Sequence, residues 1–279
     1  MIGQKNTIGY LKTTLKYFLL TIFLFLWALP IIWLIGKAFT PNSAILREGM
    51  RLFPSTWSME NIVNVLSSWP FLRWIRNSVI VSAGAMLITL IVSILAAYSF
   101  SRLQWKGRDV VFLLFLSSMF IPWEINAIPL YFVANALKLL NSHPGVFLPM
   151  ASMPIGMFLL RQFLINIPQE LEDAARIDGC KSLGVLFRIL LPMSKPAVGA
   201  VVIWIFIFSW NEFFWSMISL QRSHMLTLPI GLKTIMGSQN IEYGMLFGSS
   251  LLALIPSLIV FLLLRKNIIK GISISGSIK

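Results

Sequence analysis

Long apolar stretches separated by short polar connections dominate this sequence. Six of them have the length and composition of helices that cross a lipid bilayer, which takes about 20 consecutive apolar residues. The second runs from Ser78 to Phe100 without a charged residue. The pattern predicts an all-α integral membrane protein with six transmembrane helices, at about 17–36, 78–100, 110–132, 144–160, 196–220 and 245–264.

Three of these stretches are less regular than the others. Pro122 and Glu124 interrupt the third, Pro149 and Pro154 fall in the fourth, and Glu212 lies in the fifth. Proline removes a helical hydrogen bond, and an ionisable group at membrane depth needs a protein or water partner. The first stretch follows three lysines, but it is longer than the 7 to 15 residues of a signal-peptide core. We expect it to remain attached as a membrane anchor.

Composition agrees with a membrane protein. Hydrophobic residues make up 57% of the 279 residues and charged residues 12%, against roughly 45–50% and about 25% in soluble domains. Six helices use most of the chain, so we expect a single transmembrane domain over residues 1–279.

The distribution of Lys and Arg predicts the orientation, because these residues stay on the cytoplasmic side. With both termini cytoplasmic, 15 of the 23 fall inside, and the short loops agree. The long outer loop 37–77 fits poorly, since it carries Lys37, Arg47, Arg51, Arg73 and Arg76.

The net charge of +13 does not indicate nucleic-acid binding, because the basic residues flank apolar stretches instead of forming a dense block with aromatics. The single cysteine, Cys180, forms no intrachain disulfide, and no neighbouring Cys or His completes a zinc site. No phosphate-binding loop occurs, since Gly36-Lys37 is followed by Ala38. We expect no cofactor and no metal on this chain, and energy from another subunit.

The most polar segment, 166–192, connects the fourth and fifth stretches. Pro168 suits a first helical position, the acidic residues after it favour a helix N-terminus, and Gly179 suits a left-handed stop. We predict a helix of about three turns outside the membrane, with Leu171, Ala174, Ala175 and Asp178 on one narrow face. After Gly179, apolar residues at helical spacing predict a second helix from Leu183 that Pro192 stops.

One interpretation of this segment is a passive helical hairpin. The residues favour a second interpretation, which rests on their spacing. Asp173-Ala174-Ala175 is followed after three residues by Gly179, after nine more by Ile189, and after one more by Leu191-Pro192. This pattern resembles the Glu-Ala-Ala loop of binding-protein-dependent ABC importer permeases, whose fold is a helical membrane domain. The chain departs from that pattern in having Asp173 where the family usually has glutamate, although Glu172 precedes it.

The resemblance extends over roughly Asn77 to the C-terminus and is closest to the carbohydrate-uptake class, whose best-known member imports maltose. It is carried by Asn77-Ser78, Leu160-Arg161-Gln162-Phe163, Leu191-Pro192 with Lys195-Pro196, Trp210 to Trp215, Thr227-Leu228-Pro229 and Gly271. The resemblance implies a loop that docks as a coupling helix on a separate ATPase, which binds ATP and Mg. It implies three kinds of partner: a second permease, two ATPase subunits and an extracytoplasmic solute-binding protein. The coupling residues by resemblance are Glu172, Asp173, Ala174, Ala175, Asp178 and Gly179.

The fifth stretch carries a second group of candidate residues. Aromatic rings stack on sugar rings and amide or carboxylate groups bind hydroxyls, so Trp210, Asn211, Glu212 and Phe213 are candidates for a solute path. An interfacial aromatic belt is an equal alternative, and Glu124 has the same ambiguity. The outer loop 221–242 is either a contact for the binding protein or a plain connector.

Three classes of function were weighed against the sequence. An ion-coupled transporter or channel needs ionisable residues within its spans, and only Glu124 and Glu212 qualify. A membrane enzyme needs converging catalytic or metal-ligating groups, which His143 and His224 do not supply. The importer permease is therefore the favoured hypothesis, with the solute unspecified beyond a sugar-like class.

Overall fold

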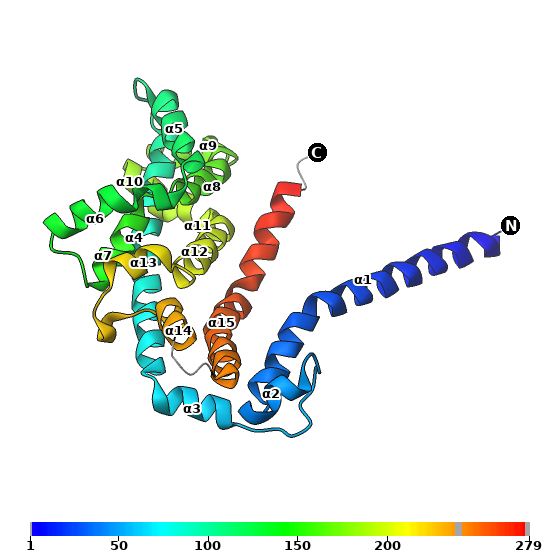
Figure 1. Cartoon of the computed structure of the whole chain (residues 1–279). Helices are drawn as coiled ribbons and strands as arrows, with labels where there is room; N and C mark the ends of the chain where they lie inside the picture. Colours follow the sequence, from blue (N-terminus) through cyan, green and yellow to red (C-terminus); the bar gives the residue numbers. More distant parts are fainter. Residues whose placement is uncertain (1, 238–241, 277–279) are drawn as a thin grey trace. The chain divides into compact units, whose positions relative to one another are not determined.

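The computed structural model describes residues 2–237 and 242–276, and every regular element in them is a helix (Figure 1). This confirms the predicted all-α fold. The longer helices are α1 (Ile2–Ala38), α4 (Phe71–Arg102), α5 (Arg108–Ser117), α6 (Ala127–Ala136), α8 (Pro154–Ile165), α12 (Lys195–Trp210) and α15 (Tyr243–Gly276). Shorter helices are α2 (Asn42–Glu48), α3 (Glu60–Ser68), η1 (Ser118–Phe120), η2 (Trp123–Asn126), α7 (His143–Phe147), η3 (Leu148–Ser152), α9 (Glu170–Ile177), α10 (Ser182–Val185), η4 (Leu186–Leu190), α11 (Leu191–Met193), α13 (Phe214–Ser219), η5 (Ser223–Met225) and α14 (Leu228–Met236).

By length and composition, three described helices are able to cross a membrane: Lys12–Ala38, Phe71–Arg102 and Tyr243–Leu263. They contain the first, second and sixth predicted spans, except that the sixth was predicted to end one residue later, at Leu264. Three further candidates are bent pairs of helices, which gives six spans if each pair counts as one. The six-helix prediction agrees with this number.

Two of the bent pairs correct the prediction of continuous third and fourth spans, and the end of α12 corrects the fifth. The third breaks by 98° between Phe120 and Trp123, and the fourth by 43° between Ser152 and Pro154. Each break contains or adjoins a proline, which cannot donate a backbone hydrogen bond. The fifth was predicted to run to Leu220, but α12 ends at Trp210 and a separate helix, α13, follows.

The chain divides into two compact units, and the first comprises residues 1–69 and 235–253. Within it, the Asn61 side-chain amide donates to the carbonyls of Ala38, at 3.0 Å, and Thr40, at 2.7 Å. The Asn42 side chain accepts from the Gly244 backbone at 3.1 Å. The buried Asn61 amide satisfies backbone atoms at the end of α1 and so fixes the chain between α1 and α3, while Asn42 satisfies an N–H at the start of α15.

The second unit comprises residues 70–234 and 254–279, and α4 packs along α8 and α12 in its core (Figure 1). Gly156 of α8 allows close packing, because a Cβ there would lie 2.5 Å from the Ser93 hydroxyl oxygen of α4. Such small residues let membrane helices approach closely. The Thr89 hydroxyl of α4 donates to the Met150 carbonyl at 3.0 Å and so satisfies backbone next to the break in the fourth span.

Candidate functional site

The helix predicted from Pro168 is shorter than expected. Helix α9 begins at Glu170 and ends at Ile177, which makes about two turns instead of three. A helix starting at Pro168 would use the Ile167 carbonyl for its first hydrogen bond. That carbonyl accepts from the Arg102 guanidinium at 2.7 Å, and the first hydrogen bonds of α9 run from the Glu172 and Asp173 N–H groups to the Gln169 carbonyl.

Helix α9 is fastened to the rest of its unit by a buried ion pair. The Arg102 Nε lies 2.6 Å from the Glu172 carboxylate, and the side chains are only 9% and 4% exposed. The same guanidinium donates to the carbonyls of Leu164 and Ile167, each at 2.7 Å, at the end of α8. Arg102 thus joins the C-terminal ends of α4 and α8 to α9. Its positive charge also complements the helix dipoles at those ends.

Sequence reasoning missed Arg102, which was counted only as one positive charge among several on the cytoplasmic side. The signal available was an arginine at the end of an uncharged span, with an acid-rich loop elsewhere in the chain. Nothing in the sequence pairs it with Glu172, which lies 70 positions later. Only the folded chain identifies the two as partners.

Gly179 forms the corner after α9. Its φ of +85° lies in the left-handed region, and its N–H donates to the Arg176 carbonyl at 3.0 Å. The Cys180 N–H donates to the Ala175 carbonyl at 2.9 Å. These two bonds define a Schellman motif, in which glycine avoids the penalty that a Cβ would bring. The predicted left-handed stop is confirmed.

Of the four residues predicted to share one face of α9, Ala175 is buried, whereas Leu171, Ala174 and Asp178 are exposed. Glu172 and Ala175 point inward and are 3% and 6% exposed. Asp173, Ala174 and Asp178 are exposed. The exposed side also carries two large apolar side chains, Leu171 at 42% and Ile177 at 86%.

The second helical segment runs past Pro192 to Met193, so the prediction that Pro192 stops it is wrong by one residue. A wide turn, η4, lets the proline fit, because the Leu191 N–H reaches the Leu186 carbonyl five residues back. Val185, Leu186 and Leu190 of this segment are buried. The packing of these apolar side chains therefore holds the Gly179 corner and the helical segment after it in place.

The candidate solute-path residues occupy different environments. The Glu212 carboxylate is 7% exposed and accepts from the backbone N–H groups of Trp215, at 2.6 Å, and Ser216, at 2.9 Å, as well as from the Ser216 hydroxyl. These bonds fix the start of α13, which explains why the fifth stretch breaks there. The structure thus gives Glu212 a role in stabilising a helix.

The other members of that group have different surroundings. Trp210 is buried and stacks on Phe206, with ring centroids 5.5 Å apart. Asn211 is exposed, and its amide donates to the Ile207 carbonyl at 2.7 Å. Phe213 faces the Lys233 ammonium, which lies 5.2 Å from the ring centroid. Glu124 is exposed in η2.

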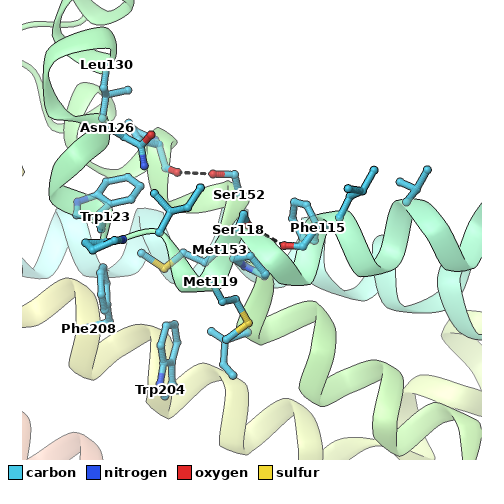
Figure 2. Close-up of a pocket in the computed structure, with 17 residues that line it drawn as sticks. Phe115, Ser118, Met119, Trp123, Asn126, Leu130, Ser152, Met153, Trp204 and Phe208 are labelled. Carbon is cyan, nitrogen blue, oxygen red and sulfur yellow. Dashed lines mark hydrogen bonds between the residues drawn. The ribbon is translucent and has the colours of Figure 1, made fainter.

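A cavity of about 860 Å³ lies where the third and fourth spans break (Figure 2). Trp204 and Phe208 of α12 form one wall and stack with centroids 5.5 Å apart. Trp123 and Asn126 of η2 contribute a ring and an amide, and Figure 2 shows Trp123 lying near Phe208. Bare backbone at membrane depth is tolerated where it lines such a cavity. Sequence reasoning did not predict this cavity.

The connection after α13 is tied to the start of α4. The Asn77 amide donates to the carbonyls of His224, at 3.0 Å, and Leu226, at 2.9 Å, and the Ser78 hydroxyl accepts from the Leu228 N–H at 2.8 Å. Part of the predicted loop 221–242, residues 238–241, lies outside the described residues. Within the described part of the chain, no group of three or more His, Cys, Asp or Glu residues is arranged to hold a metal ion.

Comparison with known proteins also indicates a transport permease. The family described as "Binding-protein-dependent transport system inner membrane component" matches residues 89–272. The arabinooligosaccharides transport system permease protein AraQ of Bacillus subtilis (strain 168) is 35% identical over 254 residues, which cover 90% of each chain. The lactose transport system permease protein LacG of Rhizobium radiobacter is 30% identical and covers 96% of this chain and 97% of its own.

A solved structure has a similar fold. A bacterial ABC transporter involved in the import of the acidic polysaccharide alginate matches with a TM-score of 0.80 at 23% identity, over 91% of this chain and 95% of that one. Because the family pattern covers well over half of the residues, and AraQ aligns at over 30% identity across nearly the whole chain, the relationship is one of family and not only of fold. The chain belongs to the family of binding-protein-dependent transport system inner membrane components.

Proposed function

We propose that this chain is the permease subunit of an ATP-driven importer and forms part of the translocation path for a sugar-like solute, with an oligosaccharide favoured. Relatives named for arabinooligosaccharide, lactose and diacetylchitobiose transport support the solute class. The chain itself is proposed to be non-catalytic and to bind no cofactor, while ATP and Mg are bound by the partner ATPase.

The assembly we propose contains this chain as one transmembrane domain, a second homologous permease, two ATPase subunits and an extracytoplasmic solute-binding protein. It resides in a bacterial or archaeal cytoplasmic membrane with both termini cytoplasmic. The positive charges of the short loops support that orientation. It places α9 on the cytoplasmic side, where an ATPase is able to reach it.

The observation that carries the proposal is the fastening of α9 by Arg102. A helix that transmits force needs an exposed side for its partner and a rigid connection to the membrane helices. The exposed side carries Asp173, Ala174 and Asp178, and the Arg102–Glu172 ion pair provides the rigid connection. We propose that the ATPase contacts the exposed side, and that Glu172 and Ala175 act from within by holding the helix.

For the solute path, the cavity bounded by Trp204, Phe208 and Trp123 is a better candidate than the residues around Glu212. Stacked aromatic faces suit the apolar faces of sugar rings, and the Asn126 amide suits a hydroxyl. The Glu212 carboxylate already accepts three hydrogen bonds at the start of α13, which leaves little of it for a solute. Glu124, Trp210, Asn211 and Phe213 remain weaker candidates.

The test is transport in proteoliposomes. This chain is co-expressed with the proposed second permease, ATPase and solute-binding protein from the same organism, and uptake of radiolabelled arabinooligosaccharides, lactose and diacetylchitobiose is measured. We expect ATP-dependent uptake of at least one sugar, and loss of uptake without the binding protein. Failure of any ATPase to co-purify with the chain, or uptake driven by an ion gradient without ATP, would contradict the proposal.

A further inference from the structure

The first unit exposes four large apolar side chains on the segment that follows α1. Leu46 lies in α2 and is 74% exposed, and Met50 lies just after that helix and is 87% exposed. Phe53 and Trp57, in the connection to α3, are 62% and 59% exposed. Single apolar residues are common on a protein surface, but several gathered in one short segment mark a contact with lipid or with another protein.

This segment folds back against the end of α1, and Figure 1 shows α2 beside that end. The Leu52 carbonyl lies so close to Gly36 that a Cβ there would be 1.9 Å from the carbonyl oxygen. The Ser58 N–H donates to the Phe39 carbonyl at 2.8 Å, and the Phe39 and Trp57 rings have centroids 5.8 Å apart. These contacts hold the segment beside the last turn of α1.

The contact with Gly36 sets the level of this segment in the membrane. The uncharged part of α1 runs from Tyr17 to Gly36, and its length of about 30 Å, at 1.5 Å per residue, equals the thickness of the hydrocarbon core. Gly36 therefore lies at one boundary of that core, the outer one in the proposed orientation. Since Leu52 lies against Gly36, the exposed side chains of Arg51 and Phe53 come to the level where hydrocarbon meets headgroups.

The composition of the segment suits such a boundary. Tryptophan is enriched at headgroup level, and arginine keeps its charge among headgroups while its stem covers apolar surface. Arg47 and Arg51 are both exposed, and neither forms an ion pair within the described part of the chain. Their guanidinium groups are therefore available to phosphate oxygens, which arginine binds through charge-assisted hydrogen bonds.

We propose that residues 46–57, which we name the interfacial segment, bind the lipid surface at the outer end of α1. The four exposed apolar side chains enter the boundary between headgroups and acyl chains, and the two arginines bind headgroup phosphates. Neither the solute nor the ATPase enters this inference, which goes beyond the proposed function and needs only α1 as a membrane span. Binding to phosphate also explains how two of the positive charges that fit the predicted orientation poorly are accommodated outside.

A lipid surface fits the interfacial segment better than a soluble protein does. A docking face for a soluble protein stands clear of the bilayer, whereas Leu52 lies level with the end of the hydrocarbon core. A membrane protein packed against the segment is the other alternative. It would exclude lipid from the same side chains, so the experiment separates the two.

The experiment measures the depth of single spin labels in the full chain, assembled with cysteine-free partner subunits in vesicles of phosphatidylethanolamine and phosphatidylglycerol. In a Cys180→Ser background, a cysteine replacing Met50 or Phe53 is labelled with a nitroxide. The collision rates of the label with oxygen, which enters lipid, and with a water-soluble nickel complex give its depth, and spin-labelled lipids calibrate the scale. Glu60→Cys, at an exposed polar position of the same unit, is the control.

We expect the labels at positions 50 and 53 to lie about 5–10 Å into the boundary between headgroups and acyl chains, and the label at position 60 to lie in water. Labels at positions 50 and 53 that the nickel complex reaches as readily as position 60 would overturn the inference. Labels that neither oxygen nor nickel reaches would also overturn it, because protein and not lipid would then cover the segment.

The part played by the arginines is tested with the label at position 50. Arg47→Glu/Arg51→Glu should move this label toward water with loss of most of its depth, because carboxylates are repelled by headgroup phosphates, while Arg47→Lys/Arg51→Lys should keep the depth. The spectrum of the label at position 60 checks that each variant keeps its fold. Equal depth in the reversal and in the lysine variant would overturn the assignment of the arginines to headgroup phosphates.

Discussion

Replacing Glu172 with glutamine tests whether the buried ion pair holds α9 in place. The substitution keeps the size and shape of the side chain but leaves the Arg102 charge without its counter-ion. Removing one partner of a buried pair costs about 3–5 kcal/mol. Arg102 retains two hydrogen bonds to carbonyls, at 2.7 Å each, so we expect the lower end, about 3 kcal/mol.

Limited proteolysis measures this loss locally. Trypsin cleaves after Arg176 only when α9 opens, and the cleavage rate follows the open population as long as closing is fast. A destabilisation of about 3 kcal/mol raises that population by roughly a hundredfold. Cleavage after the exposed Lys106 of the same chain serves as an internal reference.

The matched control is Asp173→Asn, the same kind of change at the neighbouring, exposed position. It should leave cleavage after Arg176 unchanged. The double variant Arg102→Met/Glu172→Met should be cleaved more slowly than Glu172→Gln, since no unpaired charge remains. Cleavage of Glu172→Gln at the wild-type rate would refute the view that the pair fastens α9.

Four further changes test other parts of the account. Gly179→Val should uncouple ATPase activity from transport because a β-branched residue resists φ of +85°, with Gly179→Asn milder; unchanged coupling would argue against a rigid corner. Asp173→Lys should reduce co-purification of the ATPase by reversing an exposed charge while Asp173→Glu keeps it, and equal recovery of ATPase with both would exclude an acidic contact. Glu212→Gln should lower the thermal stability of the chain by about 1–3 kcal/mol with the apparent KM for solute unchanged, whereas a selective change in KM would restore Glu212 to the solute path. Trp204→Ala should raise the KM for the transported sugar several-fold while ATPase co-purification stays normal, and an unchanged KM would remove the cavity from the path.

Much of the fold follows from local pattern. Uncharged apolar length identifies α4, because a single segment of this length satisfies its own backbone hydrogen bonds in lipid as a helix. Gly179 was assigned its conformation correctly, since glycine after a polar helix with basic last-turn residues is a local signal. Asn77-Ser78 were noted only as a fragment of the family pattern. In the structure their side chains hydrogen-bond to the backbone of residues 224–228.

What the sequence did not predict depends on contacts between distant residues. Helix α9 starts at Glu170 instead of Pro168, and the Ile167 carbonyl just before it accepts from the Arg102 guanidinium, a contact between distant parts of the chain. Pro122 marked where the third span breaks, but its 98° angle was not predicted from the sequence. Glu212 suggested a solute contact because a lone carboxylate in an apolar stretch has two explanations, and hydrogen-bond geometry distinguishes them.

The most direct test of the central claim is cross-linking from the exposed side of α9. In a Cys180→Ser background, a cysteine replacing Ala174 is treated with a short thiol-to-amine cross-linker in membranes that contain the co-expressed ATPase. A cysteine at Leu87, exposed on α4 and 65% accessible, is the control. We predict a product between this chain and the ATPase from position 174 alone, with a yield that changes when ATP is added. Equal yields from both positions, or no product from position 174 while the ATPase co-purifies, would contradict the claim that α9 receives the force of ATP hydrolysis.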